Sequence, residues 1–201
     1  MPGSTPELQY EFEVWRKLLH LFALSIPVGY HFVGHLAAIL IPAVCFAVAL
    51  FADLARLRRW SIQRFWLPIT SPIIRPKESD NFTGATYILA SGAICPAIFQ
   101  VPAAAAGMAA IILGDIAAAL IGRRWGTHRL VGNKTFEGSS GFLVAAFLGI
   151  VAVPGIGWPL ALVAAVVGTI AEAISGKVDD NLSVPLTVGL TCHLWLARAI
   201  S

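Results

Sequence analysis

Seven apolar segments follow one another along the chain, separated by short polar stretches. They cover residues 18–32, 36–52, 82–100, 102–121, 141–153, 158–175 and 184–200. Most of them approach the length of about 20 residues that a helix needs to cross the hydrocarbon core of a bilayer, and the first and fifth are expected to extend into their flanks. The pattern predicts an all-α, polytopic membrane protein with about seven transmembrane helices.

The composition agrees with this interpretation. Apolar residues make up 57% of the 201 residues and charged residues 12%, which lies outside the range of soluble domains. Seven spans use nearly the whole chain, so residues 1–201 are predicted to form one integral membrane domain. The three cysteines, Cys45, Cys95 and Cys192, all fall within apolar segments and are expected to be small core residues with no disulfide framework.

The cations predict an orientation. With seven spans, the N-terminal flank and the loops after the second, fourth and sixth segments lie on one side, and they hold all of the 14 Lys and Arg residues except Arg198. By the positive-inside rule that side is cytoplasmic, which places the N-terminus inside and the C-terminus on the opposite side. For the cluster between Arg56 and Arg64, binding of lipid headgroups is the alternative to topology alone.

Asp115 lies within an otherwise uncharged, apolar stretch, residues 101–121. Placing a carboxylate at the centre of a membrane helix costs about 2.5–3.5 kcal/mol on insertion scales, so such a residue is a candidate for function. An interhelical salt bridge or a proton relay is the alternative. The polar residues 122–141 follow directly and are rich in glycines, cations and hydroxyls, which is the chemistry expected around a polyphosphate.

A second acidic group lies near the end of the chain. Glu172 stands close to the end of the sixth segment, and Asp179, Asp180 and Asn181 follow in the next loop. Small residues at spacings of four accompany Asp115 and Glu172, which predicts that both acids face a packed helix bundle. A solvated turn is the alternative for Asp179 and Asp180.

These residue types suit a magnesium ion bound together with phosphates. Mg²⁺ takes one or two carboxylates, waters and substrate phosphates, and Asp115 and Asp180 are the predicted metal ligands. Lys134 and Arg123 are expected to offset phosphate charge, and Glu172 to act as a base or a further metal ligand. Thr135, Ser139 and Ser140 are candidates to cap the following helix.

Two blocks of sequence then resemble a known family. Residues 114–142 (GDIAAALIGRRWGTHRLVGNKTFEGSSGF) and 171–185 (AEAISGKVDDNLSVP) are similar to the CTP-dependent lipid-alcohol kinases, which include dolichol, phytol and farnesol kinases and the CTP-using diacylglycerol kinase of fungi. Two weaker blocks fit as well: residues 13–20, with Glu13, Arg16, Lys17 and His20, and residues 78–87.

The resemblance implies transfer of the terminal phosphate of CTP to the hydroxyl of a membrane-dissolved alcohol, with Mg²⁺. The predicted catalytic residues are Asp115, Lys134, Glu172 and Asp180. The predicted nucleotide contacts are Gly122, Arg123, Gly126, Lys134, Thr135, Glu137, Gly138 and Asn181. The expected partners are CTP, a lipid alcohol and membrane lipids; no nucleic acid is expected, and a homo-oligomer and the identity of the alcohol are left open.

Two other functions compete with the kinase. The central block also resembles phosphatidate cytidylyltransferase, but the KD and PGHGG..DR signature of that family is not found, and DDNLSVP stands in its place. A membrane transporter or a lipid-binding protein would also carry internal acids and small-residue packing, yet it has no need of the GNKTFEG loop. The tail therefore favours the kinase.

Overall fold

The computed structural model describes residues 18–64, 74, 78–132, 134–176 and 178–199. The seven helices that can be described are α2 (Ser25–Gly29), α3 (His35–Leu57), α5 (Gly84–Ile98), α6 (Val101–Trp125), α7 (Phe136–Val151), α8 (Trp158–Ile174) and α9 (Asp180–Arg198). In these residues the secondary structure is helical, apart from one isolated bridge between Arg129 and Thr135. The all-α class predicted from the sequence is confirmed. Glu13, Arg16, Lys17, Arg75, Lys77 and Lys177 lie outside the described residues.

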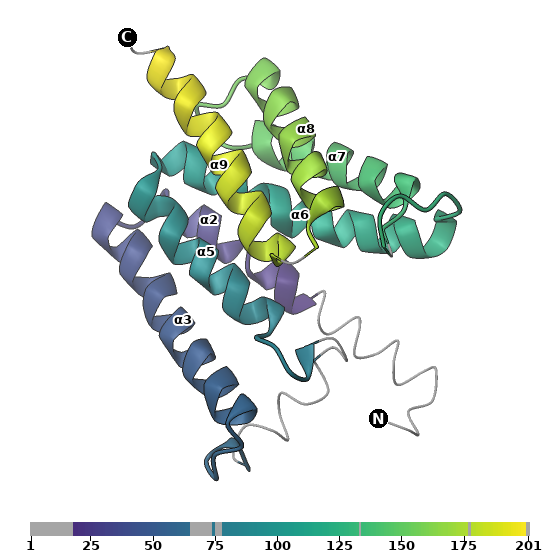
Figure 1. Ribbon diagram of the computed structural model, residues 1–201. Helices are drawn as coiled ribbons and strands as arrows, with labels where there is room; N and C mark the ends of the chain where they lie inside the picture. The colour runs from purple at the N-terminus through teal and green to yellow at the C-terminus, as the bar shows by residue number, and fades with distance from the viewer. Residues whose placement is uncertain (1–17, 65–73, 75–77, 133, 177, 200–201) are drawn as a thin grey trace.

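Helix α6 is the central element of the bundle (Figure 1). It packs against α7, α9, α5 and α2, while α8 packs on α7 and α9. On the other side of the molecule α3 lies along α5, and α5 in turn contacts α9. Gly189 of α9 lies against Ala103, and Pro185 lies against Gly107, so α6 and α9 run in opposite directions.

Every apolar segment predicted from the sequence contains a helix, but several helices differ in extent. Helix α7 begins at Phe136, not at residue 141, because the Thr135 side chain accepts a hydrogen bond from the amide of Gly138 and caps the first turn. Helix α9 begins at Asp180, not at residue 184, with Asp179 as its N-cap. In both helices the first turn is largely polar and the apolar segment begins only after it, so the hydrophobic pattern misses the first turn.

The first segment is a broken helix. Residues 18–22 and 25–29 are helical, and residues 23–24 form a turn between them. Pro27 lacks an amide hydrogen, and its ring clashes with the carbonyl of Ala23 four residues earlier in a regular helix. The Ala23 carbonyl accepts a hydrogen bond from Ile26 at 3.0 Å instead.

Two of the described helices, α3 and α6, are long and apolar enough to cross a membrane by length and composition. Four apolar helical stretches are shorter, with 10–17 residues: Leu18–Gly29, Gly84–Ile98, Phe136–Val151 and Trp158–Ile174. The sequence predicted about seven full spans, and two helices meet that criterion in the described part of the chain.

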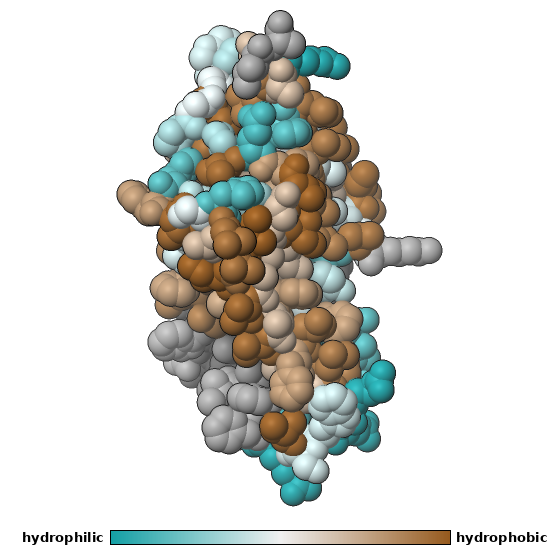
Figure 2. All heavy atoms as spheres, turned by 90° about the vertical axis from the view of Figure 1, so that its left-hand side faces the viewer, coloured by the Kyte–Doolittle hydropathy of each residue, from teal (hydrophilic) through white to brown (hydrophobic). Residues whose placement is uncertain are grey.

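One side of α3 presents a stripe of large apolar side chains. Leu36, Leu40, Val44 and Val48 recur every four residues and are each more than half exposed. Figure 2 shows this side of the molecule, with apolar side chains across its middle and hydrophilic ones gathered toward both ends. Soluble monomers rarely expose a continuous apolar surface of this kind, because it costs hydration free energy.

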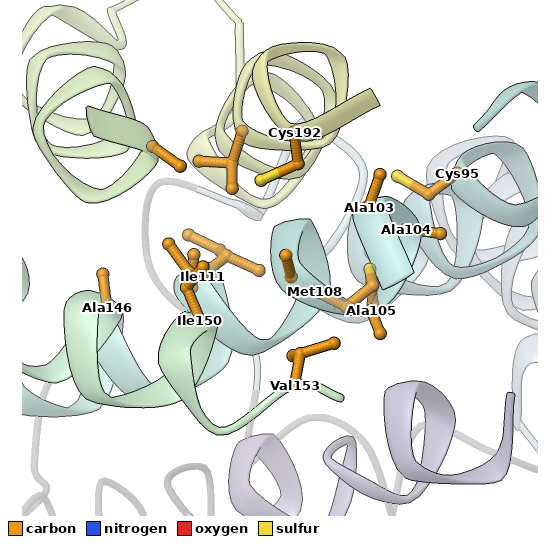
Figure 3. Close-up of a cluster of buried hydrophobic side chains, with 14 of the residues drawn as sticks. Cys95, Ala103, Ala104, Ala105, Met108, Ile111, Ala146, Ile150, Val153 and Cys192 are labelled. Atoms are coloured by element: carbon orange, nitrogen blue, oxygen red, sulfur yellow. The ribbon is translucent and has the colours of Figure 1, made fainter. Parts of the chain in front are cut away.

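The core is built around the small residues of α6. Figure 3 shows Met108 and Ile111 of α6 between Cys192 of α9 and Ile150 of α7. Cys95 and Cys192 are fully buried, as predicted, whereas Cys45 is exposed on α3, so the prediction of a core position was wrong for Cys45. All three cysteines are free thiols.

Gly107 sets the closest approach of two helices. A Cβ atom at this position would lie 2.4 Å from the backbone oxygen of Pro185 on α9. Pro185 lies inside α9 and is held by the helix on both sides, so it cannot yield as a flexible side chain would. The absence of a side chain at Gly107 therefore fixes the distance between α6 and α9.

We expect Gly107→Ala to destabilise the protein although alanine favours helix formation. Overpacking of this kind costs about 1–3 kcal/mol, which corresponds to a fall in Tm of about 2–12 °C for a chain of this size. Thermal unfolding in detergent measures the change. Gly29→Ala is the matched control, because nothing lies within 4 Å of its Cβ position; its Tm should stay the same or rise slightly. Equal Tm values for the two variants would contradict the packing role of Gly107.

Candidate functional site

One lysine joins two carboxylates at the ends of α8 and α9. The Lys134 ammonium donates a hydrogen bond to Glu172 Oε1 and another to Asp180 Oδ2, the second at 3.0 Å. The Ser139 hydroxyl donates to the other Glu172 oxygen at 3.3 Å. We call these four residues the Lys134 cluster. Residues up to 46 positions apart in sequence thus meet at one point. Lys134, Glu172 and Asp180 were among the predicted catalytic residues.

A short hairpin positions Lys134. Residues 126–135 connect α6 to α7, and Leu130 donates from its amide to the carbonyl of Lys134 at 2.9 Å, while Lys134 donates to Val131 at 3.0 Å. Gly132 has φ +59°, which lies in the left-handed region that favours glycine at a tight turn. These backbone hydrogen bonds therefore position Lys134 beside Glu172.

The charges of the cluster are strongly coupled. Side-chain exposure is 3% for Glu172, 16% for Asp180 and 31% for Lys134. Burial alone lowers the pKa of Lys134, but the neighbouring charges of Asp180 and Glu172 outweigh it, and the net direction of the pKa is upward. Lys134 is therefore charged at neutral pH. Two carboxylates share this one ammonium.

The N-terminus of α9 is ordered by its own side chains. Asp179 accepts hydrogen bonds from the amide and from the side chain of Asn181, at 3.0 and 2.8 Å. The Asn181 carbonyl accepts a hydrogen bond from Ser91 of α5 at 2.6 Å. Asp179 is thus an N-cap and Asn181 a link to α5, so Asp180 is held next to Lys134.

Glu78 lies on the far side of Asn181. It is 7% exposed and accepts a hydrogen bond from the amide of Gly84 at 3.2 Å. A Cβ atom at Gly84 would lie 3.1 Å from Asn181 Nδ2 and 3.5 Å from Glu78 Oε1, so these two side chains meet at Gly84. Glu78 carried no predicted role, and the signal that pointed to it was the weak family block at residues 78–87.

Asp53 forms a second polar network between α3 and α5. One of its oxygens accepts hydrogen bonds from the amide and hydroxyl of Thr83 and from the hydroxyl of Thr86, at 2.7–3.0 Å. Arg56 donates to its other oxygen at 3.0 Å and also to the carbonyls of residues 78, 79 and 81. From its sequence context Arg56 was expected to mark topology or to bind lipid headgroups; in the structure it also holds the segment that carries Glu78.

Asp115 lies on α6 beside the first helical segment. Its Oδ2 is 3.7 Å from Nε2 of His20, and the two side chains are 23% and 15% exposed. Asp115 lies eight residues beyond Gly107, and Asp180 lies five residues before Pro185. Because α6 and α9 are antiparallel and touch at Gly107 and Pro185, both acids lie at the same end of this helix pair.

The predicted glycines have packing roles. A Cβ at Gly122 would meet the Thr135 hydroxyl at 3.1 Å, one at Gly126 would meet the Gly122 carbonyl at 2.2 Å, and one at Gly138 would meet the Ala118 carbonyl at 3.1 Å. The amide of Gly138 already serves the Thr135 cap. Their contact with a nucleotide stays a prediction. Close contact between α6 and α7 accounts for Gly122 and Gly138, and the last turn of α6 leaves no room for a Cβ at Gly126.

Two further predicted nucleotide contacts lie at the surface beside the hairpin. Glu137 accepts hydrogen bonds from the Thr127 hydroxyl and pairs with His128 Nδ1, both at 2.7 Å. Arg123 is exposed in the last turn of α6. Ser140 bonds to the carbonyl of Phe136 within α7 and does not cap it.

The donor set fits a magnesium ion at the Lys134 cluster. The carboxylates of Glu172 and Asp180 already converge on one cationic group, and Mg²⁺ usually takes one or two carboxylates with waters and phosphates. Among the described residues there is no group of three or more His, Cys, Asp and Glu side chains placed to hold a metal. Asp115 therefore does not join Glu172 and Asp180 in one such group, and a metal here would take its other ligands from water and substrate.

Comparison with known proteins finds two relatives that align with nearly the whole chain. No family model matches the chain, and no solved structure matches it. The chain is 28% identical over 196 residues to an uncharacterized protein of Rickettsia prowazekii, covering 92% of this chain and 96% of that protein. It is 30% identical over 210 residues to phytol kinase of Synechocystis sp., covering 92% of this chain and 82% of that protein.

The fold and site define a helical protein with an apolar exposed face and a partly buried group of charges at the helix ends. The similarity to phytol kinase extends over nearly the whole chain. The protein belongs to the lipid-alcohol kinase family that includes phytol kinase.

Removal of the Lys134 ammonium should leave Glu172 buried without this partner. We expect Lys134→Ala to lower the free energy of unfolding by about 3–5 kcal/mol, the usual cost of breaking one side of a buried ion pair. Adding Glu172→Gln to this variant should recover part of the loss, because it removes the uncompensated charge. Thermal unfolding of the single and double variants gives the coupling energy.

Arg124→Ala is the control for a lost surface cation. Arg124 is exposed and its guanidinium lies 5.6 Å from the ring centre of Trp125, so its loss should change stability by about 0.5 kcal/mol or less. If the stability losses of Lys134→Ala and Glu172→Gln simply add up in the double variant, the two side chains do not stabilise each other.

Proposed function

We propose that the protein is a CTP-dependent kinase that phosphorylates the hydroxyl of an isoprenoid alcohol dissolved in the membrane. The observation that carries the proposal is the convergence of Lys134, Glu172 and Asp180 at one end of the bundle, in a chain similar to phytol kinase. CTP as the donor rests on the resemblance of residues 114–142 and 171–185 to CTP-dependent kinases.

Phosphoryl transfer depends mainly on positioning and on stabilisation of charge at the equatorial oxygens. In this proposal Lys134 contacts the phosphates of the nucleotide, with Arg123 as a second cation at the end of α6. Residues 128–132 of the hairpin are exposed and the Lys134 side chain is 31% exposed, so its ammonium has access to a ligand from outside the bundle. When the nucleotide binds, Lys134 then replaces an ion pair with a carboxylate of the cluster by a contact with the phosphates.

Asp180 and Glu172 are proposed to hold Mg²⁺, which when bound neutralises charge on the transferred phosphate. Asp115 and Asp180 were the metal ligands predicted from the sequence. Glu172 is better placed than Asp115 for this, because Glu172 and Asp180 meet at the same cation in the structure.

Asp115 is proposed to accept the proton of the attacking hydroxyl. It lies beside His20 and at the same end of the α6 and α9 pair as Asp180. A general base needs to reach the hydroxyl at hydrogen-bond distance, and a partly buried carboxylate next to an imidazole is suited to this role. His20 would orient the Asp115 carboxylate.

The proposal includes a membrane location with the site on the cytoplasmic side. The exposed apolar stripe on α3 supports contact with lipid, and α3 and α6 have the length and composition of spans. The hairpin and the α8–α9 connection both lie at the end of the bundle that carries the Lys134 cluster, which we call the polar end. The distribution of cations supports the cytoplasmic assignment, with the C-terminus on the opposite side.

Incubation of the purified protein with γ-labelled CTP, Mg²⁺ and phytol should move the label into the lipid and release CDP. Asp180→Asn and Asp115→Asn should each lower turnover at least 100-fold, since one removes a metal ligand and the other the base. Asp80→Asn is the matched control, because Asp80 is exposed and accepts a hydrogen bond from its neighbour Ser79; its turnover should equal that of the wild type.

The same assay separates the kinase from a cytidylyltransferase. With α-labelled CTP and phosphatidate, a cytidylyltransferase places the label in the lipid and releases pyrophosphate. Incorporation of α-label would overturn the kinase proposal. Retention of full turnover by Asp115→Asn would remove that residue from the mechanism and leave the interhelical contact with His20 as its role.

The orientation is tested with single cysteines in a Cys45→Ser background, where the remaining Cys95 and Cys192 are buried. In sealed vesicles, a membrane-impermeant maleimide should label Val131→Cys and Val178→Cys from the cytoplasmic side and Pro154→Cys from the other side. All three positions are exposed. Labelling of Val131→Cys and Val178→Cys from opposite sides would contradict a shared site.

A further inference from the structure

An apolar cavity of about 440 Å³ lies between α3, α5 and the broken first helix. Its walls include Leu19, Phe22, Ile26, Ala38, Pro42 and Ile88. The volume falls in the range of about 300–1,000 Å³ that is usual for pockets that bind small molecules. The cavity lies outside the Lys134 cluster, and the roles assigned above do not use it.

The chemistry of the walls fits a hydrocarbon chain. Almost every lining residue is apolar, and the hydroxyl of Tyr30, one of the polar groups present, already donates to the carbonyl of Gly92. A ligand in this cavity is therefore held by burial of apolar surface, which favours a hydrocarbon by about 25 cal/mol per Å². A polar ligand would lose its hydration without compensation.

One end of the cavity adjoins the polar residues of the site. Leu19 and Ala85 line it, and they are the sequence neighbours of His20, which lies beside Asp115, and of Gly84, where Asn181 and Glu78 meet. Thr83 and Thr86 bond to Asp53, so Ala85 lies near the level of Asp53 on α3.

The other end lies far along α3. Ala37 lines the cavity there, and the lining follows α3 from Ala37 to Cys45, eight residues or about 12 Å along a helix axis. The cavity thus runs parallel to α3 from the polar end of the bundle toward the opposite end. This shape suits an extended chain with one polar terminus.

We infer that this cavity holds the hydrocarbon chain of the substrate alcohol, with the hydroxyl at the Leu19 and Ala85 end. The inference rests on the proposed function and adds to it the place of the chain. The distance from the polar end to Ala37 then limits the length of alcohol that is bound with its hydroxyl in position.

Gly29 gives a way to shorten the cavity without disturbing the fold. It lines the cavity in the last turn of α2, and nothing lies within 4 Å of its Cβ position. Its backbone is helical, so a larger side chain is not strained there. A leucine at this position would project into open space between the polar end and Ala37.

The first test compares isoprenoid alcohols of increasing length: geraniol, farnesol and geranylgeraniol. Gly29→Leu should lower kcat/KM for geranylgeraniol at least 10-fold relative to its value for geraniol. Gly34→Leu is the matched control, because Gly34 also has open space around it but does not line the cavity; its ratio should equal that of the wild type. An unchanged ratio in Gly29→Leu would overturn the inference.

The second test needs no catalysis and uses the wild-type protein. Cys45 lines the cavity and is exposed, whereas Cys95 and Cys192 are fully buried and serve as internal controls. In detergent, N-ethylmaleimide should modify Cys45, and geranylgeraniol should slow this reaction at least 5-fold while geraniol slows it less. Mass spectrometry of the intact protein measures the rate. Equal rates with and without geranylgeraniol would contradict occupancy of the cavity.

The two tests separate the inference from the proposed function. Transfer of phosphate to alcohols with no protection of Cys45, and with no change of length preference in Gly29→Leu, would remove the cavity and leave the kinase. Protection of Cys45 without transfer to any alcohol would retain the cavity as a lipid site and remove the kinase.

Discussion

The structure depends on the neutralisation of one buried carboxylate. Glu172 is almost fully enclosed at the end of α8, and a charge in that position is tolerated only with a partner. Lys134 supplies the partner from the hairpin between α6 and α7, and Asp180 joins it from α9. A single electrostatic requirement thereby ties four helices together at one end of the bundle.

Close helix packing makes this meeting possible. The ring of Phe142 on α7 fills the space at Gly114 of α6 and also approaches Gly168 of α8, so a side chain at Gly114 would collide with it. Asp115 follows Gly114 directly, and Glu172 lies one turn beyond Gly168. Gly114 and Gly168 thus make room for the Phe142 ring, and the helix packing around this ring fixes where Asp115 and Glu172 lie.

Much of this arrangement was predictable from the sequence. The apolar segments located every described helix. Glu172 was selected as an acid within an apolar segment, and Lys134 and Asp180 were selected from the polar loops that follow such segments. The contact of Asp115 with His20 and the roles of Glu78 and Asp53 were not, because they depend on which helix faces another, and a single sequence carries no such information. The helix ends at Phe136 and Asp180 were missed because side-chain caps, not hydrophobicity, set them.

The hairpin lysine has a consequence for the assembly of the protein. The counter-ion of Glu172 is part of the same chain, so folding itself brings this carboxylate and its cation together. The pairing of Glu172 uses a side chain of the protein and no ligand. An anionic ligand that binds Lys134 would therefore compete with Glu172 and Asp180 for the same ammonium.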